Sequence, residues 1–288
     1  MNQSQYSPQG FSILPPVVKN LLILNGIFYL ATFAFGNAFH IDLVNYLGLH
    51  YWSAPDFKPW QFITYMFMHD PSNFTHIIFN MFALWMFGYL LENVWGSRRF
   101  LFYYIFTGIG AAVFHYLIWY FQYSPSIDAI NSFLSHPSLA SFTDFRNSSN
   151  FKLLDKDMVQ HFNAFVPQFN ESLSKGDIQA TQLAVEFMQQ YKAELLNAPV
   201  VIGASGAVFG ILLAFGMLFP NTVIYLYFFI PIKAKWFVIL YGGIELYSGF
   251  FNQGSGVAHF AHLGGMIFGL MLILYWKKTD RRKNDFWT

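Results

Sequence analysis

The sequence predicts an all-α membrane protein: a bundle of six transmembrane helices with a long, helical insertion between the third and the fourth. Composition is one reason, because 55% of the 288 residues are hydrophobic, 21% are aromatic and only 11% are charged, outside the range of ordinary soluble proteins. The other reason is that six apolar stretches approach the roughly 20 residues that cross a hydrocarbon core.

The expected spans cover residues 21–39, 76–94, 100–121, 200–219, 236–251 and 257–276. The fifth span is short, and a further apolar run at residues 223–232 precedes it. Because that run ends at Pro231 and Lys233, we expect a loop at the membrane interface there and not a seventh crossing.

Basic residues predict the orientation, because short cytoplasmic loops are enriched in Lys and Arg. With six crossings and the N-terminus inside, ten of the 16 cationic residues lie on the cytoplasmic side: Lys19, Arg98, Arg99, Lys233, Lys235, Lys277, Lys278, Arg281, Arg282 and Lys283. We therefore expect a multi-pass protein of a bacterial plasma membrane. Its parts are a cytoplasmic N-terminal tail (1–16), a six-helix membrane domain (17–276) and a basic cytoplasmic tail (277–288).

Two segments on the outer side are not membrane-like. Residues 40–73 are rich in Trp, Tyr and turn-forming residues, which suits a position at the membrane interface. Residues 122–197 hold most of the chain's polar residues and form the insertion. Acidic helix starts, a glycine break and apolar residues at four-residue steps predict two amphipathic helices there, in a hairpin or on the membrane surface: Asp155, Asp157, Gly176, Leu183, Phe187, Tyr191 and Leu195.

A serine flanked by glycines lies at the head of the fourth span, where residues 201–210 read V-I-G-A-S-G-A-V-F-G. The small-residue pattern by which membrane helices approach closely is formed by Gly203, Ser205, Gly206 and Gly210. The same pattern also suits a serine nucleophile. From this stretch alone both interpretations stand.

Two histidines open the sixth span, and ionisable side chains inside a membrane usually mark function. His259 and His262 lie on neighbouring parts of one helix face, and Gly265 and Gly269 form a G-x-x-x-G that allows packing on another glycine-rich helix. The expected topology places Ser205 and His262 each about one turn into its span from the outer side. This shared depth makes Ser205 a candidate nucleophile and His262 a candidate base.

The second span opens with His76 and Asn80, which share a helix face near the same surface. Both side chains carry N–H donors of the kind that an oxyanion site requires. Structural hydrogen bonds to neighbouring helices are the alternative. We expect His69 to be an exposed loop residue and Glu245 to be a packing hydrogen-bond partner without chemical function.

Other chemistries lack their residues in this chain. The absence of cysteine excludes disulfides, zinc–thiolate sites and cysteine nucleophiles, and no H-E-x-x-H zinc motif is present. The Gly176-Asp177 pair falls in the polar segment, so a membrane aspartyl dyad is not supported. We expect no metal and no cofactor, and the net charge of +1 suggests no nucleic-acid partner.

Taken together, these motifs resemble the rhomboid family of intramembrane serine proteases. The resemblance rests on G-x-S-G at 203–206, A-H-x-x-G at 261–265 continuing to Gly269, and H-x-x-x-N at 76–80, in the family's order. The stretches from Glu92 to Phe100 and from Ile230 to Trp236 are also similar to rhomboids. The resemblance covers residues 15–276.

The resemblance implies a Ser205–His262 dyad without a required third acid, which cleaves transmembrane segments of single- or multi-span membrane proteins near their outer end. It also implies that Asn80, His76 and the Ser205 backbone N–H bind the oxyanion. A catalytically silent, client-binding relative is the alternative, and a transporter or channel would place ionisable residues at the midplane of several spans.

Two features depart from the family pattern. Gln61 follows Trp60 where many members carry Arg, so the anchoring of the first outer loop is open. The segment 122–197 is longer than in simple six-helix members, and we expect it to act as an outer cap that influences which substrates reach the site. A passive surface insertion is the alternative, because long surface loops cost little free energy.

Overall fold

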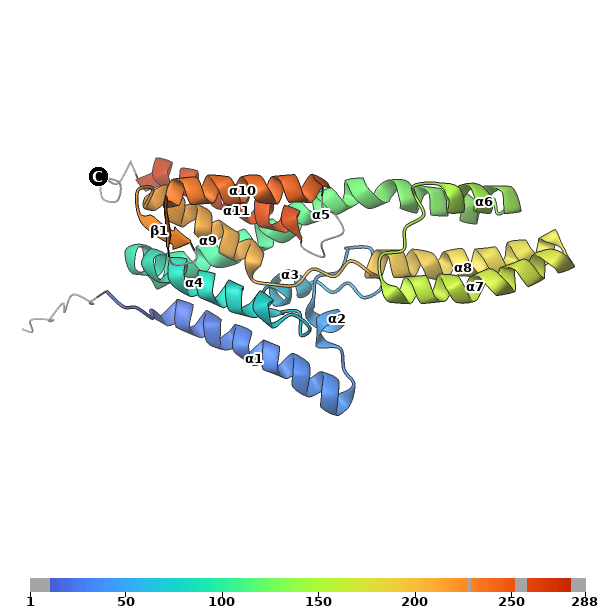
Figure 1. Ribbon diagram of the computed structural model, residues 1–288, viewed down its shortest axis with the longest axis horizontal. Helices are drawn as coiled ribbons and strands as arrows, with labels where there is room; N and C mark the ends of the chain where they lie inside the picture. The colour runs from blue at the N-terminus through green and yellow to red at the C-terminus, as the bar shows by residue number, and fades with distance from the viewer. Residues whose placement is uncertain (1–10, 227–228, 252–257, 281–288) are drawn as a thin grey trace, which may run out of the picture. The chain divides into compact units, whose positions relative to one another are not determined.

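The computed structural model describes residues 11–226, 229–251 and 258–280 of a mostly helical chain (Figure 1). The expected N-terminal tail, the predicted start of the sixth span at Val257 and most of the basic tail lie wholly or partly outside these residues. The chain divides into two compact units: unit 1 comprises residues 1–47, 62–115 and 202–288, and unit 2 comprises residues 48–61 and 116–201.

Unit 1 contains most of the apolar helices. They are α1 (Pro16–Phe39), α2 (Leu43–Leu47), η1 (Tyr65–Phe67), α4 (Phe74–Trp95), α9 (Ser205–Leu218), α10 (Ala234–Phe251) and α11 (His259–Asp280), joined by parts of α3 (Gln61–Thr64) and α5 (Ser97–Ser135). Helix α9 packs against α4, α10 and α11, and Figure 1 shows it between α4 and the α10–α11 pair. The small side chains of α9 therefore lie at the centre of this unit.

Four described helices, α1, α4, α5 and α11, are long and apolar enough to cross a membrane. The chain is thus an integral membrane protein. Helix α9 is apolar but has only 14 residues, and α10 has 18. The count of six crossings stays a prediction.

Two helices differ in their bounds from the predicted spans. The third span was expected to end at residue 121, but α5 continues through Pro125 to Ser135, because Ile130 and Phe133 near its end are buried in the core of unit 2. The fourth span was expected from residue 200, but α9 begins at Ser205. Gly203 has a φ of +123°, outside the helical region, so the helix cannot include this residue.

The apolar run before α10 forms a hairpin. Strand β1 (Val223–Leu226) pairs antiparallel with β2 (Ile230–Lys233), with Ile224 opposite Ile232. Strands of four residues reach only about 13 Å. The prediction that this run does not make a seventh crossing is therefore confirmed.

Unit 2 has an aromatic core formed by the end of α5, α6 (Leu139–Asn147), α7 (Lys156–Lys175) and α8 (Asp177–Asn197). The two predicted amphipathic helices correspond to α7 and α8, which pack together and are separated by Gly176 at a φ of +143°. Helix α6 was not predicted, although the Ser138 side chain caps its first turn. Its buried residues Phe142 and Phe145 complete the core.

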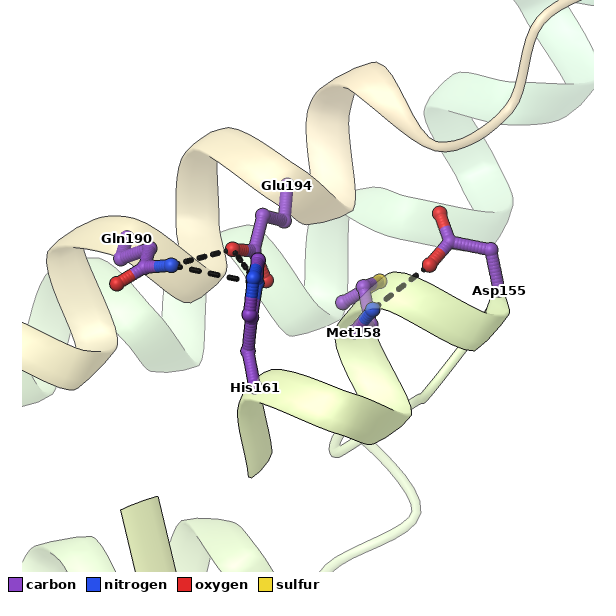
Figure 2. A network of polar contacts seen from close by, with 5 residues as sticks. All are labelled: Asp155, Met158, His161, Gln190 and Glu194. Atoms are coloured by element: carbon purple, nitrogen blue, oxygen red, sulfur yellow. Dashed lines mark hydrogen bonds and ion pairs between the residues drawn. The ribbon is translucent and has the colours of Figure 1, made fainter. Parts of the chain in front are cut away.

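Polar side chains form hydrogen bonds at the start of α7 and near the end of α8. The Asp155 carboxylate accepts a hydrogen bond of 2.8 Å from the Met158 N–H and so caps α7, as predicted (Figure 2). On the neighbouring turns Glu194 Oε1 lies 2.6 Å from His161 Nδ1 and accepts a bond of 2.7 Å from Gln190 (Figure 2). The contact between His161 and Glu194 therefore links the first part of α7 to the last part of α8.

Gln61 forms hydrogen bonds to the loop that precedes it in the chain. Its side chain is buried, and its Oε1 accepts hydrogen bonds from the backbone N–H groups of His50 and Lys58, while Nε2 donates to the Asp56 carbonyl. Although Gln61 stands where many family members carry Arg, its neutral amide binds three backbone groups of the loop and so anchors it.

Candidate active site

Ser205 is the first residue of α9 and directly follows a turn that needs glycine. Gly203 donates its N–H to the Tyr65 carbonyl at 2.9 Å and adopts a φ of +123°, which L-residues with side chains rarely adopt. The Ser205 hydroxyl therefore lies at a helix N-terminus, where backbone N–H groups have no partner within the helix and the helix dipole favours negative charge.

His262 reaches Ser205 from the first turn of α11. Its Nε2 lies 2.7 Å from Ser205 Oγ, a normal hydrogen-bond distance. The ring is only 7% exposed and stacks on Phe209, with centroids 4.3 Å apart and planes 6° from parallel. Phe209 lies one turn after Ser205 on α9, so the same helix that carries the serine also orients the histidine. Phe209 was not among the predicted site residues.

Glu245 extends this pair into a chain of hydrogen bonds. Its Oε2 lies 2.9 Å from Nδ1 of His262 and 2.7 Å from Nδ1 of His259. The carboxylate comes from α10 and is 5% exposed. The expectation of a hydrogen-bond partner agrees with the structure, but the partners are the histidines of the candidate site and not a remote packing contact. The presence of an acid inside an apolar helix was the signal that could have predicted this.

Glycines bring α9 and α11 to backbone distance. A Cβ atom at Gly265 would overlap the carbonyl oxygen of Gly206, and one at Gly206 would lie 2.6 Å from the Ala111 Cβ atom. The predicted packing of α11 on the serine-bearing helix is thus present in the structure. Gly269, the second glycine of the G-x-x-x-G, faces the Tyr103 hydroxyl of α5 instead.

His76 and Asn80 lie on α4, which also packs on α9. A Cβ atom at Gly203 would lie 3.1 Å from His76 Nε2 and 3.5 Å from Ser205 Oγ, so both atoms border the space that this glycine leaves open. Asn80 is buried and donates one N–H to the His76 carbonyl at 2.8 Å. Its amide has a second N–H.

His69 was expected on the surface and is buried, which corrects that prediction. Its ring is 0% exposed and lies against the ring of His76, with centroids 5.1 Å apart. Burial, together with the nearby His76, lowers the pKa of His69 to about 4. A loop position says little about exposure when η1 and α4 fold the loop back on the helices.

Metal binding has one candidate set among the described residues. The donor atoms of Glu245, His259 and His262 lie within 4.8 Å of one another. Two His nitrogens and a carboxylate are ligands that zinc accepts. Here each nitrogen is already hydrogen-bonded to the carboxylate, so the contacts are accounted for without an ion.

Fold and site together define a helical integral membrane protein in which a buried histidine joins a serine to a glutamate. The family model described as Rhomboid domain matches residues 56–127 and 162–278, well over half of the chain. The chain therefore belongs to the rhomboid family. The stretch between the two matched parts, residues 128–161, contains α6 and the beginning of α7. No curated protein matches the chain.

Proposed function

We propose that this protein is an intramembrane serine endopeptidase that cleaves transmembrane segments of membrane proteins near their outer end, with Ser205 as nucleophile and His262 as general base. The observation that carries the proposal is the 2.7 Å contact between Ser205 Oγ and His262 Nε2. Family membership supports the reaction class, because rhomboids are generally intramembrane serine proteases.

The arrangement provides a nucleophile and a proton acceptor and donor for the steps of peptide hydrolysis. His262 Nε2 takes the Ser205 proton as Oγ attacks the scissile carbonyl, and then gives it to the leaving amine. Water enters in the second half and hydrolyses the acyl-enzyme by the same path.

The oxyanion would form in the space over Gly203. Nε2 of His76 borders this space, the free amide N–H of Asn80 comes from the same face of α4, and α9 contributes the backbone N–H of Ser205. Such donors are each worth roughly 3–4 kcal/mol in the transition state. A side chain at residue 203 would fill the space.

Helix α9 is shorter than the thickness of the hydrocarbon core, which suggests how water and a substrate peptide could both reach Ser205 within the bilayer. At ~1.5 Å per residue its 14 residues span ~21 Å, which is ~9 Å less than a hydrocarbon core of ~30 Å. If Leu218 lies at one interface, Ser205 lies well below the other. The non-helical residues before Ser205 are tolerated at that depth only where they line a hydrated cavity or are buried in protein.

The membrane arrangement belongs to the same proposal. Helices α9 and α10 cross together with the four long helices, which gives a six-helix membrane domain at 17–276 with cytoplasmic tails at 1–16 and 277–288. Residues 122–197 then lie on the outer side of the membrane. Single- and multi-span membrane proteins are the substrates, and those with helix-weakening residues near the cut are preferred, because the segment must unwind.

Purified protein in detergent, incubated with a single-span substrate, tests the proposal. Wild type should cleave the substrate and label with a fluorophosphonate, and Ser205→Ala and His262→Ala should each abolish cleavage while the proteins stay folded, because the pair acts as a unit. Near wild-type turnover in either variant would refute the assignment. A folded wild type that binds membrane segments but neither cleaves nor labels would be a catalytically silent relative.

A further inference from the structure

We propose that Glu245 is a positioning residue for this reaction: it holds His262 in the tautomer that accepts the serine proton and stabilises the imidazolium that forms. This inference rests on the proposed function and adds an acid to what the family resemblance gives as a two-residue site. Its role is exerted through His262, since the carboxylate contacts that ring and not the serine.

The geometry determines which nitrogen carries the proton. A carboxylate accepts hydrogen bonds and does not donate them, so contacts of 2.7 and 2.9 Å to one Oε2 place a hydrogen on Nδ1 of both His259 and His262. A neutral His262 then has its lone pair on Nε2. Because Nε2 faces Ser205 Oγ at 2.7 Å, the serine donates to it, which is the arrangement that proton transfer needs.

The second histidine explains how a carboxylate is retained among apolar helices. Burying a carboxylate without partners is costly, and the cost falls when N–H groups bind it. Nδ1–H of His259 and of His262 both bind Oε2, and the side chains of His259 and Glu245 are 11% and 7% exposed. His259 therefore supplies a second N–H donor to the carboxylate that contacts His262.

Charge development during the reaction gives the carboxylate its effect. When His262 takes the serine proton, its ring becomes a cation in a site with little water. The Glu245 carboxylate lies 2.9 Å from Nδ1 and stays deprotonated throughout, so it stabilises that cation while the oxyanion forms elsewhere. An amide at this position can still accept from Nδ1–H but carries no charge.

Glu92 is the matched control, because it is a second glutamate buried within an apolar helix. It is 2% exposed on α4 and accepts hydrogen bonds from the backbone N–H groups of Val17 and Val18 and from the Ser97 hydroxyl. These contacts cap the start of α1. Loss of its charge should affect stability and leave the chemistry unchanged.

The experiment compares Glu245→Gln with Glu92→Gln in detergent. Glu245→Gln should lower kcat about 10²-fold with KM within about twofold of wild type, since the tautomer survives in part and the charge does not. Glu92→Gln should lower the melting temperature and leave kcat unchanged. ¹⁵N-histidine NMR, with the His262 signals identified by their loss in His262→Ala, should show a protonated Nδ1 in wild type that is shifted or lost in Glu245→Leu.

The outcomes separate the two proposals. If wild type neither cleaves nor labels, the proposed function fails, and the NMR signal still decides whether Glu245 orders His262. If Glu245→Gln keeps wild-type kcat, or loses activity only in step with its melting temperature, Glu245 is a packing residue and the inference is wrong. An unprotonated Nδ1 of His262 in wild type would overturn it equally.

Discussion

The two units of this protein differ in how each is packed internally. In unit 1 the site lies where helices meet at backbone distance, with Gly206 and Gly265 at the contact and polar side chains beside it. In unit 2 the core is rich in aromatic rings, with Phe165 and Phe187 stacked 4.1 Å apart and Phe142 and Tyr191 packed around them. An added atom at such a backbone contact must force the helices apart, whereas a truncated ring in a side-chain core leaves a cavity.

This difference suits what each unit must do. The proposed proton transfer between Ser205 and His262 requires α9 and α11 to keep their register to within about half an ångström. Nothing of that kind is needed among the rings of unit 2, which supply buried area and stability. Substitutions in the two units should therefore differ in kind as well as in size.

The largest effect should come from Gly265→Val. The added side chain would overlap the Gly206 carbonyl and force α11 away from α9, which separates His262 from Ser205. We expect complete loss of fluorophosphonate labelling and of cleavage. Gly243→Val on α10 is the control, because no atom lies within 4 Å of a Cβ atom there. Normal labelling of Gly265→Val would show that the contact is not tight.

Phe187→Ala tests unit 2 in the same way. Phe187 is 8% exposed and contacts four other aromatic rings of the core, so truncation should cost about 3–5 kcal/mol of local stability. Hydrogen exchange should accelerate in α6, α7 and α8 while fluorophosphonate labelling of Ser205 stays at the wild-type rate. The exposed Ile178→Ala on α8 is the control. Loss of labelling in a folded Phe187→Ala protein would contradict the separation of the two units.

Much of this could be read from the sequence, because local patterns encode it. Apolar length predicted the long helices, the Asp155 cap and Gly176 break predicted α7 and α8, and the depth argument paired Ser205 with His262. The depth argument was only approximately correct, since Ser205 is the first residue of α9 and not one turn into it. Ser205 still contacts His262, because the turn at Gly203 changes the residue at which the helix begins and does not move the serine away from the histidine.

The remaining features depend on contacts between segments far apart in the chain. Glu245 is separated from His259 by 14 residues, and only the packing of α10 on α11 makes it their common acceptor. The continuation of α5 to Ser135 likewise depends on burial of its last turns by α6 and α8. No periodicity within either segment signals such contacts.

A smaller effect on the chemistry is expected for Asn80→Ala. One donor of the proposed oxyanion site would be lost while His76 and the backbone N–H remain, so turnover should fall on the order of 10²-fold or less. Asn25→Ala is a close control, because the buried Asn25 makes the same bond to the carbonyl four residues before it, at 2.7 Å. If both variants lose thermal stability and labelling together, Asn80 is a structural hydrogen bond.

Buried polar groups of unit 1 should also make its stability depend on pH. The pKa of His69, in the loop between η1 and α4, is lowered from 6.5 to about 4 by burial, so the unfolded chain binds a proton more readily than the folded one between these values. Stability is complete above pH 6.5 and is lost as pH falls toward 4, by about 2 kcal/mol between pH 7 and 5.

Thermal unfolding in detergent at pH 7 and pH 5 measures this loss. His69→Asn cannot titrate and should show a smaller decrease than wild type, whereas His136→Asn at an exposed position of unit 2 should match wild type. An equal decrease in His69→Asn and wild type would assign the pH dependence to other groups.

The smallest effect should come from His259, whose Nδ1 is hydrogen-bonded to the Glu245 carboxylate. His259→Ala removes one of the two donors to the carboxylate but leaves the bonds of His262 to Glu245 and Ser205, so kcat should fall less than about tenfold. His259→Gln restores an N–H donor and should recover part of that loss. A folded but inactive His259→Ala would reopen the choice between the two histidines as base, because a residue that only steadies the carboxylate cannot abolish proton transfer.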